Sequence, residues 1–420
     1  MKVCVIGNGG REHALAWRLS ISPSVTKVYA IPGSAAMSDC AELVGIDWQQ
    51  SDHLIRFLKD NHVDLVVVGP EAPLVAGLAD ALNTAGIPVF GPSKAAAQLE
   101  GSKVFAKDLM KKYNIPTAAY GVFHKVDEAK EFIGQIGAPI VVKADGLAAG
   151  KGVVVAMTVE EANAAVEDML SCNRFGDAGS TVVIEEFMEG EEASLLAFVD
   201  GKTVVPMIAS QDHKRIFDGD KGPNTGGMGT YAPAPVLTDT LRDEAMKTIL
   251  EPMVAAMQKE GLPYVGCLYA GLMITPQGPK VIEFNARFGD PETQVVLPLL
   301  DSDLGQIMMT CATGTLTADM VKWKDSSAAC VILASKGYPE TSSKGDVIHG
   351  DIKQHDTTIV FHSGTKLMGD EYVTNGGRVL GVVGLGKDLR TALDRAYGRI
   401  EHIDFEGMQY RTDIGAKAFK

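Results

Sequence analysis

The stretch VIEFNARFGDPETQ, residues 281–294, opens as a β-strand and ends in a polar turn. Because side chains alternate along a strand, Glu283 and Asn285 share one face, about 7 Å apart along the chain. Two oxygen ligands at that spacing suit a hard cation such as Mg²⁺, which completes its coordination with water and phosphate. The turn adds Arg287, Asp290 and Glu292, and a guanidinium beside a cation is what a phosphate-transfer site needs. The alternative interpretation is a solvated strand end with ordinary turn residues.

The composition is that of an ordinary globular protein, with 46% apolar and 22% charged residues. The length of 420 residues predicts roughly three domains. The net charge of −14 argues against nucleic acid or an anionic membrane as the main partner. Six scattered cysteines without a CxxC pair favour a reducing compartment and argue against structural zinc. The chain enters a strand at once, and no apolar run approaches the roughly 20 residues of a membrane span. We therefore expect a cytoplasmic protein.

Residues 1–102 are predicted to form a doubly wound parallel sheet. Four short apolar runs read as strands: KVCVIG, VTKVYAI, VDLVVVGP and IPVFGP. Helices are expected at Arg11–Leu19 and Leu74–Ala85. Apolar strands that alternate with helices are typical of such a sheet, and its ligands bind at the carboxyl ends of the strands. Two of those ends carry Gly7–Glu12 and Gly69–Glu71.

Two further units are predicted after the N-terminal one. Residues 103–325 begin with Lys103 on a helix and contain a compact α+β piece, about 119–188, that we interpret as a lid. Residues 326–420 are β-rich, with the apolar runs AACVILASKGYP, TTIVFHSGT and GGRVLGVVGLG. A helix is expected after them at Leu389–Ile400, where apolar residues recur at helical spacing.

The segment GNGGRE, Gly7–Glu12, follows a strand and opens a helix. Backbone N–H groups and the helix N-terminus bind anions in that context. It is not a complete dinucleotide fingerprint, because Glu12 stands where GxGxxG requires its third glycine and would crowd and repel a pyrophosphate. A monophosphate fits better, with Arg11 beside it. The alternative is a tight turn without a ligand.

The segment VVKADGLAAGKGV, residues 141–153, is a second phosphate-binding candidate, with Lys143 on a strand. The loop after it is supple enough to close on a ligand because of its glycines, and it carries a lysine at its tip: Gly146, Gly150, Gly152 and Lys151. It differs from a Walker A loop, in which Ser or Thr follows the lysine. A glycine-rich hairpin with surface lysines is the alternative.

Two polar clusters follow. The acidic pairs Glu185–Glu186 and Glu191–Glu192 come after an apolar strand, where backbone groups could read an adenine edge and a carboxylate could hold ribose hydroxyls. The run SQDHKR, 210–215, and the loop GPNTGGMG, 222–229, could cradle a small substrate. Taken alone, either cluster is more typical of a solvated surface. No Ser/His/Asp or Cys/His arrangement is recognisable, which argues against covalent catalysis by the protein.

The order of these motifs resembles the ATP-grasp superfamily: a lysine on a helix, a lysine before a glycine loop, paired glutamates, and Glu-Phe-Asn on a strand. The runs SQDHKR, GPNTGGMG and NARFGDPETQ resemble, more narrowly, the phosphoribosylamine–glycine ligases, also called glycinamide ribonucleotide synthetases. GNGGREH near the N-terminus and TNGGRVLGVVGLG near the C-terminus are similar to that family too. The resemblance covers nearly the whole chain, and motifs of this length rarely match by chance.

The resemblance implies an α/β and α+β multidomain protein: an N-terminal doubly wound sheet (the pre-ATP-grasp domain), an ATP-grasp core with a mobile lid, and a C-terminal β-rich domain. It implies that ATP drives the ligation of glycine to 5-phosphoribosylamine through glycyl phosphate, in de novo purine biosynthesis. The cofactors implied are ATP and Mg²⁺ or Mn²⁺. The partners implied are small molecules, without nucleic acid or membrane. We expect a monomer, with a weak dimer as the alternative.

The resemblance also implies site residues. The metal ligands would be Glu283 and Asn285. The nucleotide would be held by Lys103, Lys143, Gly146, Gly150, Lys151, Gly152, Glu185, Glu186, Phe187 and Glu192, with Glu191 as a rival for the ribose position. The other substrates would be held by Gly9, Gly10, Arg11, Glu12, Pro70, Glu71, Asn224, Gly226 and Gly227. Catalytic roles would fall to Arg287, Asp290, Asp212 and Lys214.

Three rival functions remain open at this point. Another ATP-grasp ligase would use a different acid or amine. A nicotinamide-dependent oxidoreductase would need a full fingerprint and an acidic residue after the second strand. Glu12 and the run Ile31–Gly33 argue against it. A catalytically silent binding protein would have no use for the Glu283 and Asn285 pair.

Overall fold

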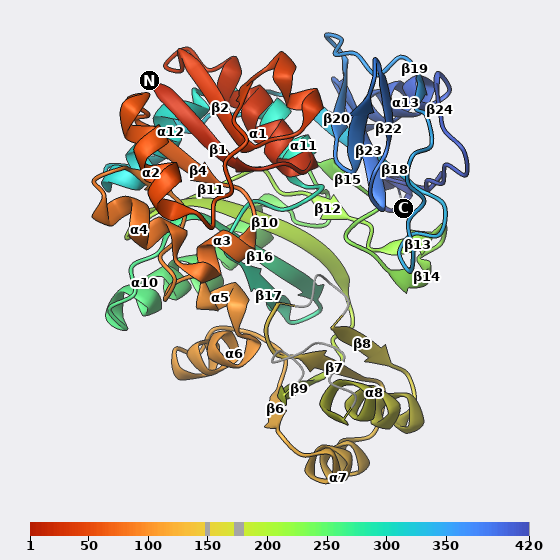
Figure 1. Ribbon diagram of the computed structural model, residues 1–420. Helices are drawn as coiled ribbons and strands as arrows, with labels where there is room; N and C mark the ends of the chain where they lie inside the picture. The colour runs from red at the N-terminus through yellow and green to blue at the C-terminus, as the bar shows by residue number, and fades with distance from the viewer. Residues whose placement is uncertain (148–151, 172–179, 420) are drawn as a thin grey trace.

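The computed structural model describes residues 1–147, 152–171 and 180–419. Figure 1 shows a body that contains the N-terminal, central and C-terminal sheets, and a smaller α/β piece that projects from it. The mixed α/β multidomain architecture expected from the sequence is confirmed. No helix among these residues is both long enough and apolar enough to span a membrane.

The N-terminal sheet is parallel throughout, in the order β3-β2-β1-β4-β5. Its strands are β1 (Lys2–Gly7), β2 (Lys27–Pro32), β3 (Glu42–Leu43), β4 (Leu65–Val68) and β5 (Val89–Phe90). The order of connection reverses between β1 and β4, and ligands bind in the crevice at such a switch point. The predicted doubly wound sheet is therefore present.

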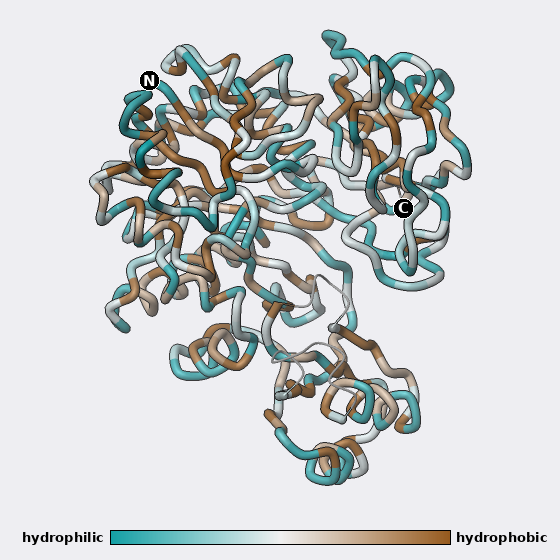
Figure 2. The backbone as a smooth tube through the Cα atoms, viewed as in Figure 1, coloured by the Kyte–Doolittle hydropathy of each residue, from teal (hydrophilic) through white to brown (hydrophobic). Residues whose placement is uncertain are grey.

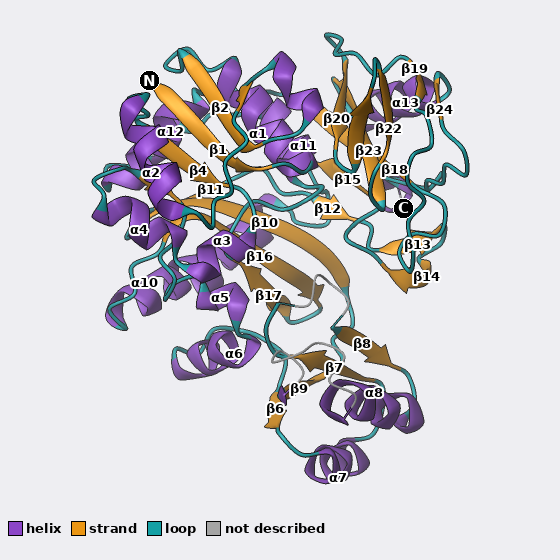
Figure 3. Ribbon diagram, in the orientation of Figure 1, coloured by secondary structure: helices purple, strands orange, loops and turns teal. Residues whose placement is uncertain are grey.

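Helices flank this sheet, as Figure 3 shows: α1 (Gly10–Ser20), α2 (Ser51–Asp60), α3 (Glu71–Ala76) and α4 (Leu78–Thr84). The 3₁₀-helix η1 (Ala35–Asp39) follows β2. The helix expected over 11–19 is confirmed, but the single helix expected over 74–85 is wrong. Gly77 has φ 98° and ends α3 before α4 begins. A left-handed residue stops a helix in this way. Both helices bury leucines, so the apolar pattern runs on across the break.

The central sheet is antiparallel, in the order β11-β10-β16-β17. Its strands are β10 (Glu191–Asp200), β11 (Val204–Pro206), β16 (Val265–Thr275) and β17 (Gly278–Asn285), which carries the predicted acidic strand. The helices of this part are α5 (Gln98–Gly101), α6 (Lys103–Lys112), α9 (Asp239–Ala245), the π-helix η3 (Met246–Leu250), α10 (Glu251–Lys259), α11 (Thr293–Val296), η4 (Leu297–Leu299), α12 (Leu304–Thr313) and η5 (Ala318–Met320).

Three phenylalanines join the N-terminal and central sheets. The ring centroids of Phe90 on β5 and Phe198 on β10 lie 6.3 Å apart. Phe288 lies 6.0 Å from the first ring and 6.2 Å from the second. Figure 2 shows hydrophobic stretches along the strands inside the body and hydrophilic ones around them. The two sheets therefore share an apolar interior, which fixes the crevice of one against the acidic strand of the other.

The projecting piece, which we call the lid, is a four-stranded antiparallel sheet in the order β6-β9-β7-β8. Its elements are β6 (Tyr120–Phe123), α7 (Val126–Ile136), β7 (Ile140–Ala144), β8 (Val153–Ala156), α8 (Val159–Ser171) and β9 (Val182–Glu186). Both helices pack on one face and form a separate apolar core with it. Strand alternation turns Lys143 and Glu185 to the opposite face.

The C-terminal sheet is antiparallel, in the order β12-β15-β18-β23-β20. Its strands are β12 (Gln211–Asp212), β15 (Gly229–Ala232), β18 (Ser327–Ala334), β20 (Thr358–His362) and β23 (Arg378–Gly386). Helix α13 (Leu389–Ile400) packs on it, with the bounds predicted. The predicted boundary at 325/326 separates β12 and β15 from the rest of this sheet, and it stays a prediction.

Short elements complete the fold. They are the paired strands β13 (Arg215–Phe217) and β14 (Lys221–Asn224), β19 (His349–Gly350) and β24 (Ile403–Asp404), β21 (Thr365–Met368) and β22 (Glu371–Thr374), and the 3₁₀-helix η6 (Ala416–Phe419).

Candidate active site

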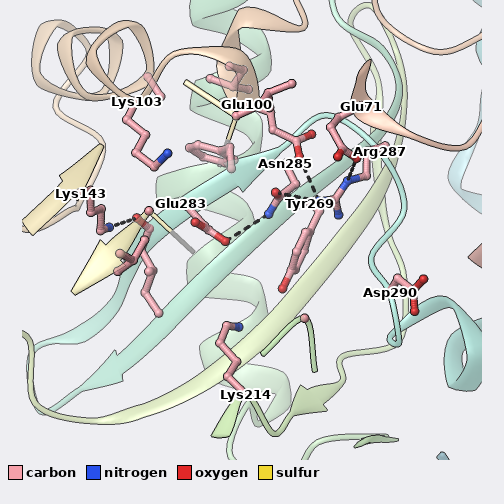
Figure 4. Close-up of a pocket in the computed structure, with 18 of the residues that line it drawn as sticks. Glu71, Glu100, Lys103, Lys143, Lys214, Tyr269, Glu283, Asn285, Arg287 and Asp290 are labelled. Atoms are coloured by element: carbon pink, nitrogen blue, oxygen red, sulfur yellow. Dashed lines mark hydrogen bonds and ion pairs between the residues drawn. The ribbon is translucent and has the colours of Figure 1, made fainter. Parts of the chain in front are cut away.

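A cavity of about 350 Å³ opens where all four parts of the molecule meet. Each part contributes a charged residue to the lining: Arg11 from α1, Lys143 from the lid, Glu283 from β17 and Arg378 from β23. Figure 4 shows three lysines around Glu283 on the central sheet. The cavity therefore joins the crevice of the N-terminal sheet to the predicted cation site.

Glu283 and Asn285 lie side by side on β17, as strand alternation predicted, and the Asn285 amide nitrogen lies 3.5 Å from Glu283 Oε1. Burial alone would raise the pKa of Glu283, but three cations outweigh it and lower that pKa: Lys214, Lys143 and Lys103. The carboxylate is therefore ionised. Within the described ranges, no group of three or more His, Cys, Asp or Glu side chains could hold a metal ion. Two hard oxygen donors that leave room for phosphate and water fit Mg²⁺ chemistry.

The two lysines expected at the phosphates, Lys103 and Lys143, both line the cavity. Lys103 is the first residue of α6, and its Nζ donates to the Gly146 carbonyl at 2.9 Å. Lys143 Nζ lies 2.9 Å from Glu185 Oε1 and donates to the Ile282 carbonyl at 3.2 Å. Both amines thus lie between lid and body.

The glycine loop is placed only in part. Gly146 and Gly152 line the cavity, whereas Gly150 and Lys151 lie outside the described residues. Asp145, which the sequence interpretation passed over, accepts from the first two backbone N–H groups of α6 at 2.6 and 3.2 Å. A carboxylate at a helix N-terminus satisfies donors that have no partner within the helix. Asp145 thus ties the lid loop to the helix that carries Lys103.

A second cavity, of about 190 Å³, lies between the lid and the central sheet. Four predicted residues line this cavity and not the first, namely Glu186, Phe187, Glu192 and Asn224. Four more line both cavities: Lys143, Glu185, Lys214 and Glu283. The rival residue Glu191 is not part of this lining. The geometry therefore favours Glu192 for the predicted ribose position.

Arg287 is held between two carboxylates. Its Nη2 lies 2.9 Å from Glu100 Oε1, and its Nε lies 3.3 Å from Glu71 Oε2. Glu100, on α5, also accepts from the backbone N–H of Ala286 at 2.7 Å. Burial raises the pKa of Glu100, against the pull of Arg287. The sequence interpretation missed Glu100 because a lone glutamate carries no motif, and only the folded chain brings it to Arg287.

The N-terminal loop is closed by its own glutamate. The Glu12 carboxylate accepts from the Gly9 N–H at 2.7 Å and pairs with Arg11 Nε. It also fills the turn, since a Cβ on Gly7 would lie 2.4 Å from Glu12 Cγ and a Cβ on Gly69 would lie 2.3 Å from Glu12 Oε1. This packing leaves no room for a pyrophosphate at the turn, as expected.

Arg11 and Glu71 are the two residues of this predicted substrate site that line the large cavity. Arg11 Nη1 lies 3.9 Å from Glu71 Oε2 and donates to the Phe288 carbonyl at 3.2 Å. Four other predicted residues shape the loops behind them and are not part of the lining: Gly9, Gly10, Glu12 and Pro70. Contacts from these four to a ligand stay predictions.

Asp212 and Lys214 both line the cavity, as does Glu292. Lys214 Nζ lies 3.3 Å from Glu192 Oε2 and 3.8 Å from Asp212 Oδ2. Burial, followed by the nearby Glu292, raises the pKa of Asp212 to about 8. Glu292 accepts from the Tyr269 hydroxyl at 2.8 Å. Neither Tyr269 nor Glu292 was among the predicted site residues, although Glu292 stands in the deciding stretch.

Arg378 brings the C-terminal sheet into the cavity. Its Nη1 donates to the carbonyls of Gly226 and Asp290, both at 2.8 Å, and lies 3.4 Å from Asp290 Oδ1. The Gly226 N–H donates to the Tyr338 hydroxyl at 2.9 Å. Gly226 and Asp290 line the cavity, whereas Gly227 lies behind them. In the sequence, the run TNGGRV that contains Arg378 supported only the family resemblance. The contacts of Arg378 are with segments far away along the chain, so no local pattern predicted them.

Models of three domains of phosphoribosylglycinamide synthetase match this chain: the N domain over residues 1–100, the ATP-grasp (A) domain over 101–293 and the C domain over 328–417. The chain belongs to the phosphoribosylglycinamide synthetase family. The family resemblance of the sequence motifs is thereby confirmed.

Curated relatives named phosphoribosylamine–glycine ligase are similar along the whole chain. The one from Halalkalibacterium halodurans is 53% identical over 418 residues, which cover 100% of this chain and 97% of the relative. The one from Neisseria meningitidis serogroup A is 53% identical over 421 residues, which cover 100% of this chain and 99% of the relative.

Similar solved structures include a member of the same family and a protein that shares the fold alone. The phosphoribosylamine–glycine ligase of Thermotoga maritima has a TM-score of 0.86 and 33% identity, and covers 99% of this chain and 100% of its own. The biotin carboxylase domain of Hydrogenobacter thermophilus 2-oxoglutarate carboxylase has a TM-score of 0.74 and 17% identity, and covers 97% and 91%. The latter likeness concerns the fold alone.

Proposed function

We propose that this chain is an ATP-dependent carbon–nitrogen ligase that joins glycine to 5-phosphoribosylamine and releases glycinamide ribonucleotide, ADP and phosphate, as in de novo purine biosynthesis. The observation that carries the proposal is a single cavity lined by Arg11 of the N-terminal crevice and by Lys143 and Glu283 of the ATP-grasp part. Identity of 53% to ligases of this name, along the full length, supports the same reaction.

ATP-grasp enzymes use ATP with a divalent metal, and the H. thermophilus neighbour is a complex with MgADP. We assign the adenosine to the smaller cavity beside Phe187 and Glu192. The phosphates are assigned to the larger cavity beside Lys103 and Lys143. The lysines around Glu283 supply the local positive charge that a triphosphate requires in a protein of net charge −14.

Glu283 and Asn285 would hold the divalent ion, because their carboxylate and amide groups share one face of β17 and line the larger cavity. A bound cation supplies neutralisation of phosphate charge. We propose Mg²⁺, with Mn²⁺ as the alternative, since both prefer oxygen ligands.

The proposed reaction consists of two transfers. A carboxylate oxygen of glycine attacks the γ-phosphorus of ATP, the bond to the bridging β–γ oxygen breaks, and ADP leaves. The amine nitrogen of phosphoribosylamine then attacks the carbonyl carbon of glycyl phosphate, loses a proton and displaces phosphate. Such transfers depend on positioning and charge neutralisation. Closure of the lid would exclude the water that otherwise hydrolyses glycyl phosphate.

Catalytic roles for the cavity-wall residues are part of the proposal: Arg287, Asp290, Asp212 and Lys214. Arg287 contacts both Glu71 of the N-terminal crevice and Asn285 of the proposed metal pair, and it suits the glycine carboxylate or the transferring phosphate. Burial alone would raise the pKa of Asp290, but the positive charges of Arg378 and Arg11 outweigh it and lower that pKa. The carboxylate is therefore ionised and suits the amine of a substrate.

The phosphate of phosphoribosylamine is assigned to Arg11 and the N-terminus of α1. The turn filled by Glu12 disfavours the rival oxidoreductase, which would place a pyrophosphate there. We further propose that the protein acts on small molecules as a monomer in the cytoplasm.

Substrate-dependent ADP release tests the proposal. With ATP and Mg²⁺ present, ADP should accumulate with glycine plus phosphoribosylamine and not when either is omitted or when alanine replaces glycine. Glycinamide ribonucleotide should form in equal amount. Release of ADP with another acid or amine, and none with this pair, would favour a different ATP-grasp ligase. The same assay with Mn²⁺ in place of Mg²⁺ compares the two cations.

A further inference from the structure

Lys107, Lys143 and Glu185 form a buried ion cluster in the wall of the cavity. Lys107 Nζ lies 3.0 Å from Glu185 Oε2, and Lys143 Nζ lies 2.9 Å from Glu185 Oε1. The three residues are 2%, 4% and 2% exposed, respectively. Lys107 lies on α6, one helical turn beyond Lys103, and the proposed reaction gives it no role.

The cluster holds two cations and one anion. Burial lowers the pKa of Lys107 to about 8, against the pull of Glu185, so its amine is protonated at neutral pH. An unbalanced charge is costly in a buried place unless an ion of opposite sign compensates it. The surplus positive charge of this cluster faces the cavity in which we place the phosphates.

The two lysines differ in how firmly they are held. Lys107 Nζ also donates to Thr117 Oγ1 at 2.8 Å and lies 5.8 Å from the centroid of the Tyr120 ring. Thr117 in turn donates to the Val281 carbonyl at 2.7 Å, which fixes it to the central sheet. Among the residues that the structure describes, Lys143 on the lid strand β7 adds one hydrogen bond to its ion pair, the longer 3.2 Å donation to the Ile282 carbonyl. Lys143 is therefore the lysine that can turn away from Glu185.

We propose that Lys107 is a positioning residue that stays with Glu185 as its counter-ion, so that Lys143 can turn to the nucleotide phosphates. The inference rests on the proposed function, because it takes Lys143 to be a phosphate ligand. Without Lys107, a turn of Lys143 would leave a buried carboxylate without a cation, which is strongly unfavourable. Glu185 would then hold Lys143 back, and the protein would bind nucleotide more weakly.

A double-mutant cycle tests this, read by calorimetry with Mg²⁺ and the non-hydrolysable analogue adenylyl imidodiphosphate, without glycine or amine. Lys107→Met should weaken binding about tenfold or more in the wild-type background. In the Glu185→Gln background the same change should cost less than about threefold, because no carboxylate then needs a counter-ion. Lys107→Arg keeps the charge and should restore most of the affinity. In turnover, Lys107→Met should raise the KM for ATP and spare that for glycine.

The matched control is Lys112→Met on the same helix, whose side chain is 61% exposed and should leave binding unchanged. Thermal unfolding of every variant checks folding, and Lys107→Gln replaces Lys107→Met in the cycle if the latter does not fold. An equal loss of nucleotide affinity in the two backgrounds, or no loss in the wild-type background, would overturn this inference but not the proposed function. A wild-type protein that binds no nucleotide would overturn the proposed function as well, so the two failures are distinguishable.

Discussion

Glu283 illustrates how neighbours decide the role of a single residue. Burial works against its charge, yet the surrounding lysines lower its pKa and keep the carboxylate ionised. Lys103 has the opposite balance, since burial lowers its pKa more than Glu283 raises it. The site thus combines a buried anion with neighbouring cations, a charge pattern that suits the proposed metal ion and phosphates.

Replacing Glu283 by glutamine tests this balance directly. Glu283→Gln keeps the shape and removes the charge, so turnover should fall about 100-fold or more while the circular dichroism spectrum is retained. The measurement is steady-state ADP release at saturating Mg²⁺. Glu251→Gln, on an exposed face of α10, serves as the control. Unchanged turnover would contradict the metal role.

Sequence reasoning brought together those cavity residues that lie close along the chain. Glu283 and Asn285 share a face because side chains alternate along a strand, and Gly146 and Gly152 after Lys143 line the same cavity. Glu100 and Arg378 could not be found like this. Their partners lie 186 and 152 residues away along the chain, and no local pattern records which distant segments will pack together.

Some strands and helices were also predictable from the local sequence pattern, and others were not. Helix α13 has the predicted bounds because an unbroken apolar face runs along it, and β17 follows from its alternation. The break at Gly77 was missed, since buried leucines continue on both sides of it. A glycine within an apolar helical pattern is ambiguous, and only the observed φ of 98° shows that it separates two helices.

Two glycine substitutions in the N-terminal part should have opposite effects. Gly77→Ala should lower the free energy of unfolding by about 1–2 kcal/mol, because alanine is strained at that φ although no atom blocks its Cβ. Gly45→Ala should be neutral or raise it by up to about 1 kcal/mol, since Gly45 has no positive φ and open space around it. Urea denaturation of both variants provides the comparison. An equal change in the free energy of unfolding for the two variants would contradict the left-handed conformation of Gly77 as the cause of the destabilisation.

The C-terminal sheet joins the catalytic part of the molecule through shared strands and through one arginine. Strands β12 and β15 come from the segment between the lid and β16, so the sheet takes Asp212 to its edge. Arg378 then ties the Gly226 loop to the Asp290 turn by their carbonyl groups. The structure thus places a residue of the C-terminal sheet, Arg378, in the cavity wall.

Arg378→Ala should therefore affect the part of the cavity around Gly226 and Asp290. Loss of its two donations should loosen the Gly226 loop and lower turnover about 10- to 100-fold, with a higher KM for glycine. Nucleotide affinity should be unchanged, because Arg378 is not part of the smaller cavity assigned to the adenosine, and in the larger cavity it donates to Gly226 and Asp290. Arg395→Ala, on an exposed face of α13, is the control. A fall in nucleotide affinity as large as the fall in turnover would contradict this assignment.

A crystal structure of the protein with MgADP tests the central claim, that the nucleotide binds between the lid and the central sheet. The adenine should lie beside Phe187 and Glu192, with the phosphates within reach of Lys103 and Lys143. Nucleotide bound instead at the Gly7–Glu12 turn of the N-terminal sheet would contradict the account.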